Sequence, residues 1–379
     1  MNRGLLYTLL SLAFVATILV KTLFFSHLFS DGFVFDEIYY VTSARYIYHR
    51  LGLYSGFRPP IVGNTTVYNN TIIIDVSVSS GLITIPINLG RYNWLNVEHP
   101  ILGKIVIGAI LLASGDSLVL TRIALLAFSA ITVFLFSRRV LEKYGLLSLV
   151  GMALVAALDW CYYHFTYLAV LDTLMIDCIL ISLYFLLDGR YREGIIFMSL
   201  SIAFKEIAVA FALGLVLYMV LRGRGRDAIT LLLASATALA IGYGLYTVFV
   251  PLHMVVGSLI SLASIVDPFA CKNLCLTGLE YTWGMFKLYT PLVWLWFAGL
   301  ACLAVEERVK GEVENSKYIP FSVALVYILF VVFIGYKRAI YPFYYAPLII
   351  LLPTITPSFS ILADIFLCLK RRYALYCDI

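Results

Sequence analysis

The sequence predicts an all-α polytopic membrane protein, and three observations point to this class. The chain has 379 residues, of which 62% are hydrophobic and only 13% are charged. Its mean hydropathy is +0.95, whereas a soluble domain needs roughly 25% charged residues to cover its surface. Apolar runs long enough to cross a bilayer recur along the chain, with Lys and Arg gathered between them. This composition excludes a disordered or nucleic-acid-binding protein.

The predicted transmembrane helices follow the apolar runs. They cover about 5–27, 118–137, 145–161, 168–187, 227–250, 289–305, 318–335 and 342–366, together with the run 192–221. That last run is too long for one simple helix and is interrupted by Lys205 and Glu206. It therefore predicts two short helices that meet at these two residues, in a bundle of about 10–11 transmembrane helices.

The basic residues predict how the helices are oriented. They cluster at Arg3, Arg138, Arg139, Lys143, Arg190, Arg192, Arg222, Arg224, Arg226, Arg308, Lys310, Lys317, Lys370, Arg371 and Arg372. If every cluster faces the cytoplasm, then 101–117 does not cross the membrane and lies on its outer surface. Both termini are then cytoplasmic, and the loops carry an extracytoplasmic site, in a cell membrane or the endoplasmic reticulum.

This topology divides the chain into five segments. They are a retained first transmembrane helix at 1–27, an extracytoplasmic loop at 28–117, a transmembrane bundle at 118–250, a second extracytoplasmic loop at 251–288, and C-terminal helices with a short cytoplasmic tail at 289–379. The first loop is expected to carry juxtamembrane helices at about 36–50 and 99–117. Its β-branched stretches between Val67 and Ile87 predict a small hairpin.

The loops also contain candidate modification sites. Asn64 and Asn69 each begin an N-glycosylation sequon in the first loop. Cys271 and Cys275 in the second loop are close enough in sequence to form a disulfide, and an unpaired state fits the sequence equally well.

The residues that suggest chemistry stand at both ends of the first loop. Asp36 and Glu37 follow the first transmembrane helix directly, and Glu98, His99 and Lys104 precede or begin the predicted surface helix. Taken alone, the two acids favour the start of a helix. Together with the second group, they suggest a site at the membrane surface.

In this order, the residues resemble the protein O-mannosyltransferase branch of the GT-C glycosyltransferases. The similar segments are Asp36-Glu37, His99-Pro100 with Leu102-Gly103-Lys104, Arg122, Tyr167–Thr173, Ile202–Lys205, and Arg338 with Tyr341–Pro347. Tyr167 and Ile101 depart from the family, which has Arg and a second Pro at these positions, and the chain lacks the soluble sugar-binding-like domain of eukaryotic members. The resemblance implies a GT-C bundle and transfer of mannose from dolichyl phosphate to a protein hydroxyl.

The chemistry of such a transfer assigns a role to each residue. A carboxylate must take the proton of the acceptor hydroxyl, which is the role expected of Asp36, with Glu37 positioning the acceptor or tuning Asp36. Cations must stabilise the leaving phosphate, and Lys205 and Arg338 are the candidates. The acceptor or sugar pocket is assigned to Glu98, His99, Lys104, Asp172 and Arg122. Because the acceptor displaces the phosphate in a single step at the sugar carbon, the anomeric configuration is expected to invert.

Structural roles compete with several of these assignments. Lys205 could form an ion pair with its neighbour Glu206, and His99 could cap the surface helix or bind a metal. Asp177, deeper in its helix than Asp172, is expected to make a hydrogen bond between helices. No metal or other cofactor is expected to be required, although a divalent cation is an alternative. The expected partners are a polyprenyl-phosphate sugar, an acceptor protein or lipid, membrane lipids and a second copy of the chain, but no nucleic acid.

Two other functions fit parts of the sequence. A transferase of the related aminoarabinose branch would glycosylate a lipid or a glycan instead of a protein. A transporter could use Asp172, Asp177 and Lys205 to line a path, but the chain shows no internal repeat of the kind transporters often have.

Overall fold

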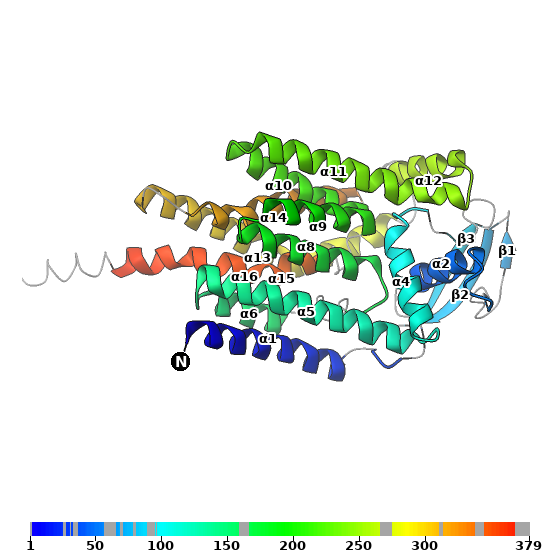
Figure 1. Ribbon diagram of the computed structural model, residues 1–379, viewed down its shortest axis with the longest axis horizontal. Coiled ribbons are helices and arrows are strands. Elements are labelled where there is room, and N and C mark those ends of the chain that lie inside the picture. Colours follow the sequence, from blue (N-terminus) through cyan, green and yellow to red (C-terminus); the bar gives the residue numbers. More distant parts are fainter. Residues whose placement is uncertain are drawn as a thin grey trace, which may run out of the picture.

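The computed structural model describes residues 2–25, 28–30, 32, 37–56, 66–68, 71–78, 81–88, 95, 97–158, 167–265, 275–310, 314–337 and 345–367. These residues form a long helical bundle with a small sheet at one end (Figure 1).

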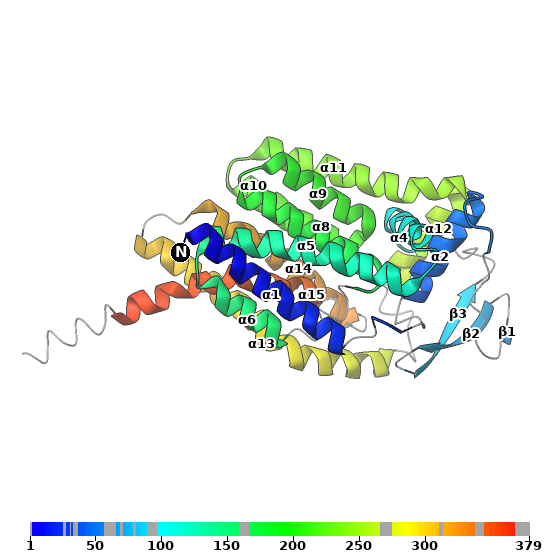
Figure 2. The same cartoon turned by 60° about the horizontal axis from the view of Figure 1, so that its bottom comes forward.

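The bundle consists of helices that run back and forth along its long axis (Figures 1 and 2). They are α1 (Arg3–Phe25), α5 (Leu118–Tyr144), α6 (Ser148–Leu158), α8 (Leu171–Leu187), α9 (Tyr191–Phe204), α10 (Val209–Leu221), α11 (Gly225–Gly244), α13 (Cys275–Lys310), α14 (Tyr318–Lys337), and the succession α15 (Ala346–Ile350), α16 (Leu352–Ile355) and η5 (Thr356–Phe359). Short turns join many of them, and Gly145 and Gly223 adopt the left-handed backbone conformation that such turns require (φ 76° and 69°).

Three of the described helical segments are long and apolar enough to cross a bilayer on their own: Arg3–Phe24, Leu118–Tyr144 and Gly225–Val248. Shorter apolar helices pack beside them, including Glu206–Leu221, Tyr318–Val331 and Leu352–Leu367. The outer faces of the three long helices expose apolar side chains such as Leu9, Ile131 and Leu233, as lipid-facing surfaces do. The chain is therefore an integral membrane protein with a polytopic helical bundle, as the sequence predicts.

One end of the bundle, here called the basic end, carries residues from several of the predicted basic clusters, among them Arg139, Lys143 and Arg224. Arg139 pairs with Asp188, and Lys143 lies 2.6 Å from Glu314. The guanidinium of Arg224 stacks over Tyr191 at 3.4 Å, which joins the α10–α11 turn to the start of α9. These contacts join four parts of the chain at this end: the end of α5, the α8–α9 turn, the α10–α11 turn and the segment at Glu314. Lys370, Arg371 and Arg372 lie outside the described residues.

The opposite end, here called the loop end, carries the elements of the first loop (Figure 2). Helix α2 (Glu37–Arg50) and helix α4 (Leu102–Ala113) pack against each other there, and α4 lies across the bundle instead of along it (Figure 1). A crosswise α4 fits the surface placement predicted for 101–117, which stays a prediction. Ser117 then starts α5, its hydroxyl accepting a hydrogen bond from the Leu120 N–H at 3.2 Å.

The small sheet at the loop end contains β1 (Thr66–Tyr68), β2 (Thr71–Val78) and β3 (Gly81–Asn88) in the order β1-β2-β3. All pairs are antiparallel, with Tyr68 opposite Thr71 and Val78 opposite Gly81. The predicted hairpin is therefore a three-stranded sheet, because the short β-branched run before Thr71 also joins it.

Two predicted segments can be compared directly with the helices observed. The run 192–221 forms two short helices as expected: α9 ends at Phe204, Lys205 is extended (φ −150°, ψ 125°), and η1 (Glu206–Ala208) leads into α10. The stretch 251–288 is not mainly a loop. Helix α12 (Leu252–Ile265) and the first half of α13 occupy much of it, because apolar residues continue well before the predicted start of the transmembrane helix at 289. Between α11 and α12 lies a short helical turn, η2 (Leu245–Val248).

Candidate functional site

The first ion pair of the loop end lies between Glu37 and Arg122, whose side chains are both 0% exposed. Glu37 begins α2, and Arg122 lies one turn into α5. The guanidinium donates to Glu37 through Nε (2.9 Å) and Nη2, and to the carbonyls of Ser30 (2.6 Å) and Gly32 (2.7 Å). The N–H of Ala169 donates to the same carboxylate at 2.8 Å. The pair thus binds three chain segments together in the interior.

The second ion pair lies between Asp172 and Lys205. Asp172 is in the first turn of α8, and Lys205 is the extended residue between α9 and η1. The ammonium donates to both carboxylate oxygens, at 2.7 and 2.6 Å. The side chains are only 8% and 4% exposed, respectively. The structural pairing considered for Lys205 is therefore observed, but its partner is Asp172 and not the adjacent Glu206.

Glu206 makes a third contact, with His99. The Nδ1 atom of His99 lies 2.9 and 3.0 Å from the two carboxylate oxygens. Since an ionised carboxylate only accepts hydrogen bonds, His99 donates through Nδ1, which directs Nε2 away from Glu206. The ring of Tyr40 lies 5.8 Å from the imidazole, centroid to centroid.

Lys104 lies fully buried beneath His99, near the start of the crosswise helix α4. Its ammonium donates to the Leu95 carbonyl at 3.0 Å and to the Tyr246 hydroxyl at 2.6 Å, and Tyr246 donates to the His99 carbonyl at 2.7 Å. Burial lowers the pKa of Lys104 to about 7, although Glu98 and Glu206 act in the opposite direction. These contacts fix the backbone that presents His99.

These three contacts belong to one continuous region. Ala169, which contacts Glu37, lies three residues before Asp172, and Lys205 and Glu206 are adjacent in sequence. The chain of contacts therefore runs from Arg122 through Glu37, the start of α8 and the α9–α10 turn to His99. The first two pairs are buried, whereas the side chains of His99 and Glu206 are 18% and 26% exposed. The accessible side of the region is therefore at His99 and Glu206.

The structure brings most of the sequence-predicted residues to this region. Described there are Glu37, Glu98, His99, Lys104, Arg122, Asp172 and Lys205. Glu98 is partly exposed, and its carbonyl accepts a hydrogen bond from the Tyr243 hydroxyl at 3.1 Å. Asp36, Arg338, Asn64, Asn69 and Cys271 lie outside the described residues, and Cys275 is the first residue of α13.

Burial changes the interpretation of three of these residues. Arg122 and Lys104 were expected to line a pocket for acceptor or sugar, but neither side chain is exposed. Each donates its hydrogen bonds within the protein, to backbone carbonyls and to one neighbouring side chain, which is Glu37 for Arg122 and Tyr246 for Lys104. Glu37 is equally buried, and it holds the start of α2 to Arg122 and to the Ala169 N–H. All three side chains therefore tie parts of the chain together.

Glu206 and Tyr246 also belong to this region, although the sequence did not identify either as a site residue. Glu206 was considered only as a partner of Lys205, and Tyr246 lies at the end of a long apolar run. The signal that could have identified Glu206 was its position at the tip of a broken apolar run, next to a lysine.

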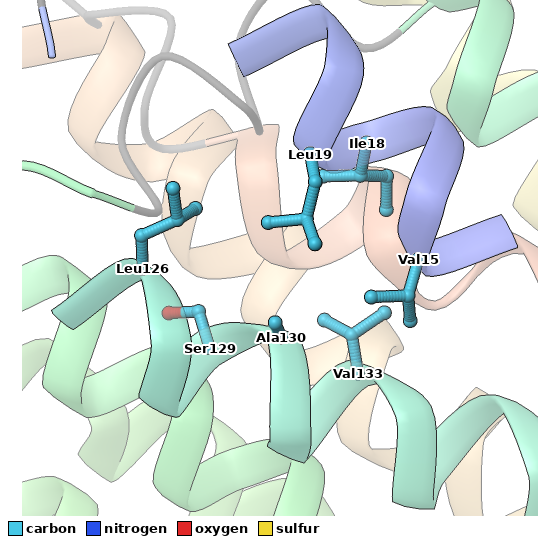
Figure 3. A pocket seen from close by; sticks show the side chains of 7 residues that line it. All are labelled: Val15, Ile18, Leu19, Leu126, Ser129, Ala130 and Val133. Atoms are coloured by element: carbon cyan, nitrogen blue, oxygen red, sulfur yellow. The ribbon is translucent and has the colours of Figure 1, made fainter. Parts of the chain in front are cut away.

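Asp177 makes the interhelical hydrogen bonds expected of it. Ser129 and Thr132 of α5 each donate a hydroxyl hydrogen bond to its carboxylate on α8, both at 2.7 Å. The same stretch of α5 lines a small apolar pocket with α1, in which Val15, Ile18 and Leu19 face Leu126, Ala130 and Val133 (Figure 3). The pocket begins one helical turn after Arg122 along α5.

Among the residues that the structure describes, no group of three or more His, Cys, Asp or Glu side chains is arranged to hold a metal ion. In the described part of the site, carboxylates balance the charge of two of the cationic side chains. Arg122 and Lys205 are each in direct contact with a carboxylate.

Comparison with known proteins gives one structural similarity. The chain is similar to a crystal structure of ArnT from Cupriavidus metallidurans bound to undecaprenyl phosphate, with a TM-score of 0.47 and 16% sequence identity. The alignment covers 91% of this chain and 59% of that one, so this chain spans less than two thirds of the length of ArnT. No family model and no curated protein matches the sequence.

Proposed function

We propose that the protein is an inverting glycosyltransferase that moves a sugar from a polyprenyl-phosphate donor to an acceptor hydroxyl. The reaction takes place at the loop end, which faces the extracytoplasmic side because the basic end faces the cytoplasm. Mannose on a dolichyl or related phosphate is the donor proposed from the resemblance to the protein O-mannosyltransferases.

One observation carries the proposal. Carboxylates and cations from segments far apart in the sequence converge at one end of a membrane bundle, around Glu37, Asp172, Lys205 and His99. A lipid-linked sugar has its phosphate at the membrane surface and its tail in the bilayer, and so meets the protein at this level. Ionisable groups are costly at such depths unless they serve function or pair with one another.

In the proposed reaction, Asp36 takes the proton from the acceptor hydroxyl as the oxygen attacks the sugar carbon. The bond from that carbon to the phosphate oxygen breaks, and polyprenyl phosphate leaves with the electron pair. Lys205, assisted by Arg338, stabilises the charge on the phosphate. Glu37, the residue after Asp36 in the chain, holds the start of α2 through its ion pair with Arg122.

A protein Ser or Thr hydroxyl is the acceptor that the resemblance favours, and a lipid or glycan hydroxyl is the second candidate. The partly exposed His99 and Glu206 lie on the side from which either acceptor can approach. Both residues can form hydrogen bonds to a hydroxyl.

The test is transfer of radiolabelled mannose from dolichyl phosphate by the purified protein in lipid nanodiscs, with Ser- and Thr-rich peptides in one arm and membrane lipid extract in the other. We expect labelled product in one arm and a loss of about 100-fold or more in rate with Asp36→Asn. Asp227→Asn is a matched control at the basic end, where Asp227 pairs with Arg224. Full activity of Asp36→Asn would remove Asp36 as the base. No transfer from mannose, glucose or aminoarabinose donors would refute the proposed function.

A further inference from the structure

We propose that Asp172 competes with the donor phosphate for Lys205, so that this ion pair opens when the lipid binds and closes again to release it. The inference rests on the proposed function. It assigns Asp172 a role in lipid affinity and product release, in place of a contact with the sugar.

The geometry of the pair supports an exchange of partners. Lys205 is in an extended backbone conformation between two helices, and its ammonium contacts both oxygens of Asp172. The next residue, Glu206, is 26% exposed through its side chain, whereas Lys205 itself is only 4% exposed. The partly exposed Glu206 is thus the neighbour in sequence of the buried Lys205, at the turn between α9 and α10.

Electrostatics favours the exchange for a phosphate in particular. The pair is formally neutral when closed, and a lysine ammonium is a point charge that can turn from one anion to another. A sugar phosphodiester carries one negative charge, whereas the polyprenyl phosphate formed by transfer carries up to two. Lys205 is therefore attracted more strongly to the product than to the donor. When Asp172 pairs with Lys205 again, the polyprenyl phosphate loses its contact with the ammonium and is released more readily.

Asp177 provides a comparison within the same helix. It lies five residues after Asp172 and is also buried, but it accepts hydrogen bonds from the hydroxyls of Ser129 and Thr132. Converting Asp177 to Asn removes a buried carboxylate from α8 without removing a contact to a lysine. Only the change at Asp172 should therefore alter lipid binding.

The experiment measures binding of undecaprenyl phosphate and of undecaprenol to the full chain in detergent by native mass spectrometry. The wild type should prefer the phosphate. Asp172→Asn should lower the Kd for undecaprenyl phosphate by about tenfold, which corresponds to roughly 1.4 kcal/mol. Lys205→Met should raise that Kd by about tenfold or more, and Asp177→Asn should leave it within about twofold, while none of the three changes binding of undecaprenol.

The outcomes separate the inference from the proposed function. A wild type that binds both lipids equally would refute the proposed use of a polyprenyl phosphate. A wild type that prefers the phosphate, with an Asp172→Asn variant that binds it equally or more weakly, would refute the competition alone.

A measurement on the wild type covers the case in which Asp172→Asn does not fold. Dicyclohexylcarbodiimide, an apolar carboxyl reagent, is added with and without undecaprenyl phosphate, and modified peptides are quantified. Lipid binding should increase modification of Asp172 several-fold and leave Asp177 unchanged. Equal modification of Asp172 in both samples would contradict the exchange.

Discussion

The buried pair between Glu37 and Arg122 gives the sharpest prediction about stability. In Glu37→Gln the guanidinium keeps its bonds to Ser30 and Gly32 but loses its compensating charge in a place with no solvent exposure. Removing one partner of such a pair costs about 3–5 kcal/mol. This corresponds to a fall in melting temperature of about 4–6 °C for a chain of this size.

The assay is thermal unfolding in detergent, followed by intrinsic fluorescence, for Glu37→Gln, Arg122→Met and the double variant. Because the single changes each leave a buried group unpaired, their effects should not add, and the double variant should be less destabilised than the sum by about 1 kcal/mol or more. Glu142→Gln is the matched control, since Glu142 pairs with Arg138 and Arg139 on the surface of the basic end, where such pairs contribute at most about 1 kcal/mol. Single variants as stable as this control, or strictly additive effects, would refute the reasoning.

Three further predictions follow from the same structure. Lys104 has a pKa of about 7 in the folded protein, below its ordinary value of 10.5. Between pH 7 and pH 10.5 the unfolded chain therefore carries a proton on Lys104 that the folded protein does not. Through this residue, the free energy of unfolding rises with pH across that range. The stability difference between wild type and Lys104→Met should therefore change by at most about 1.4 kcal/mol per pH unit from pH 7 to 9 in unfolding titrations, and a constant difference would contradict the pKa. A methyl group on Gly214 would lie 2.4 Å from the Ser322 carbonyl of α14, whereas one on Gly257 would meet nothing within 4 Å. Gly214→Ala should thus cost about 1–3 kcal/mol and Gly257→Ala should not destabilise, and equal melting temperatures would count against the packing of α10 on α14. Reporter fusions after Gly115 and after Val140 should report opposite sides of the membrane, residue 115 outside and residue 140 inside, and a shared side would contradict the crossing by α5.

The architecture of the bundle was accessible from the sequence because it depends on local signals. Apolar length predicts each transmembrane helix, and the side on which Lys and Arg accumulate predicts the crosswise placement of 101–117. The break at Lys205 could be placed because two charged residues interrupt an apolar run. The extent of α13 could not, since its apolar character continues for more residues than a bilayer requires.

The pairing of the charged residues was not accessible in the same way. Glu37 and Arg122 are 85 positions apart, His99 and Glu206 are 107 apart, and Lys104 and Tyr246 are 142 apart. No periodicity or spacing links residues at such separations, and only tertiary packing brings them together. The sequence could identify Asp172 and Lys205 individually as candidates. It associated Lys205 with its neighbour Glu206, however, and so did not predict the ion pair between Lys205 and Asp172.

The most direct test of the proposed site is a cryo-electron microscopy structure of the wild-type protein with a polyprenyl-phosphate sugar bound. The account predicts density for the phosphate at the loop end, within hydrogen-bonding distance of the Lys205 ammonium, with the sugar directed toward His99. A phosphate bound at the basic end, or at the loop end with the Asp172–Lys205 contact intact and the phosphate distant from it, would contradict the account.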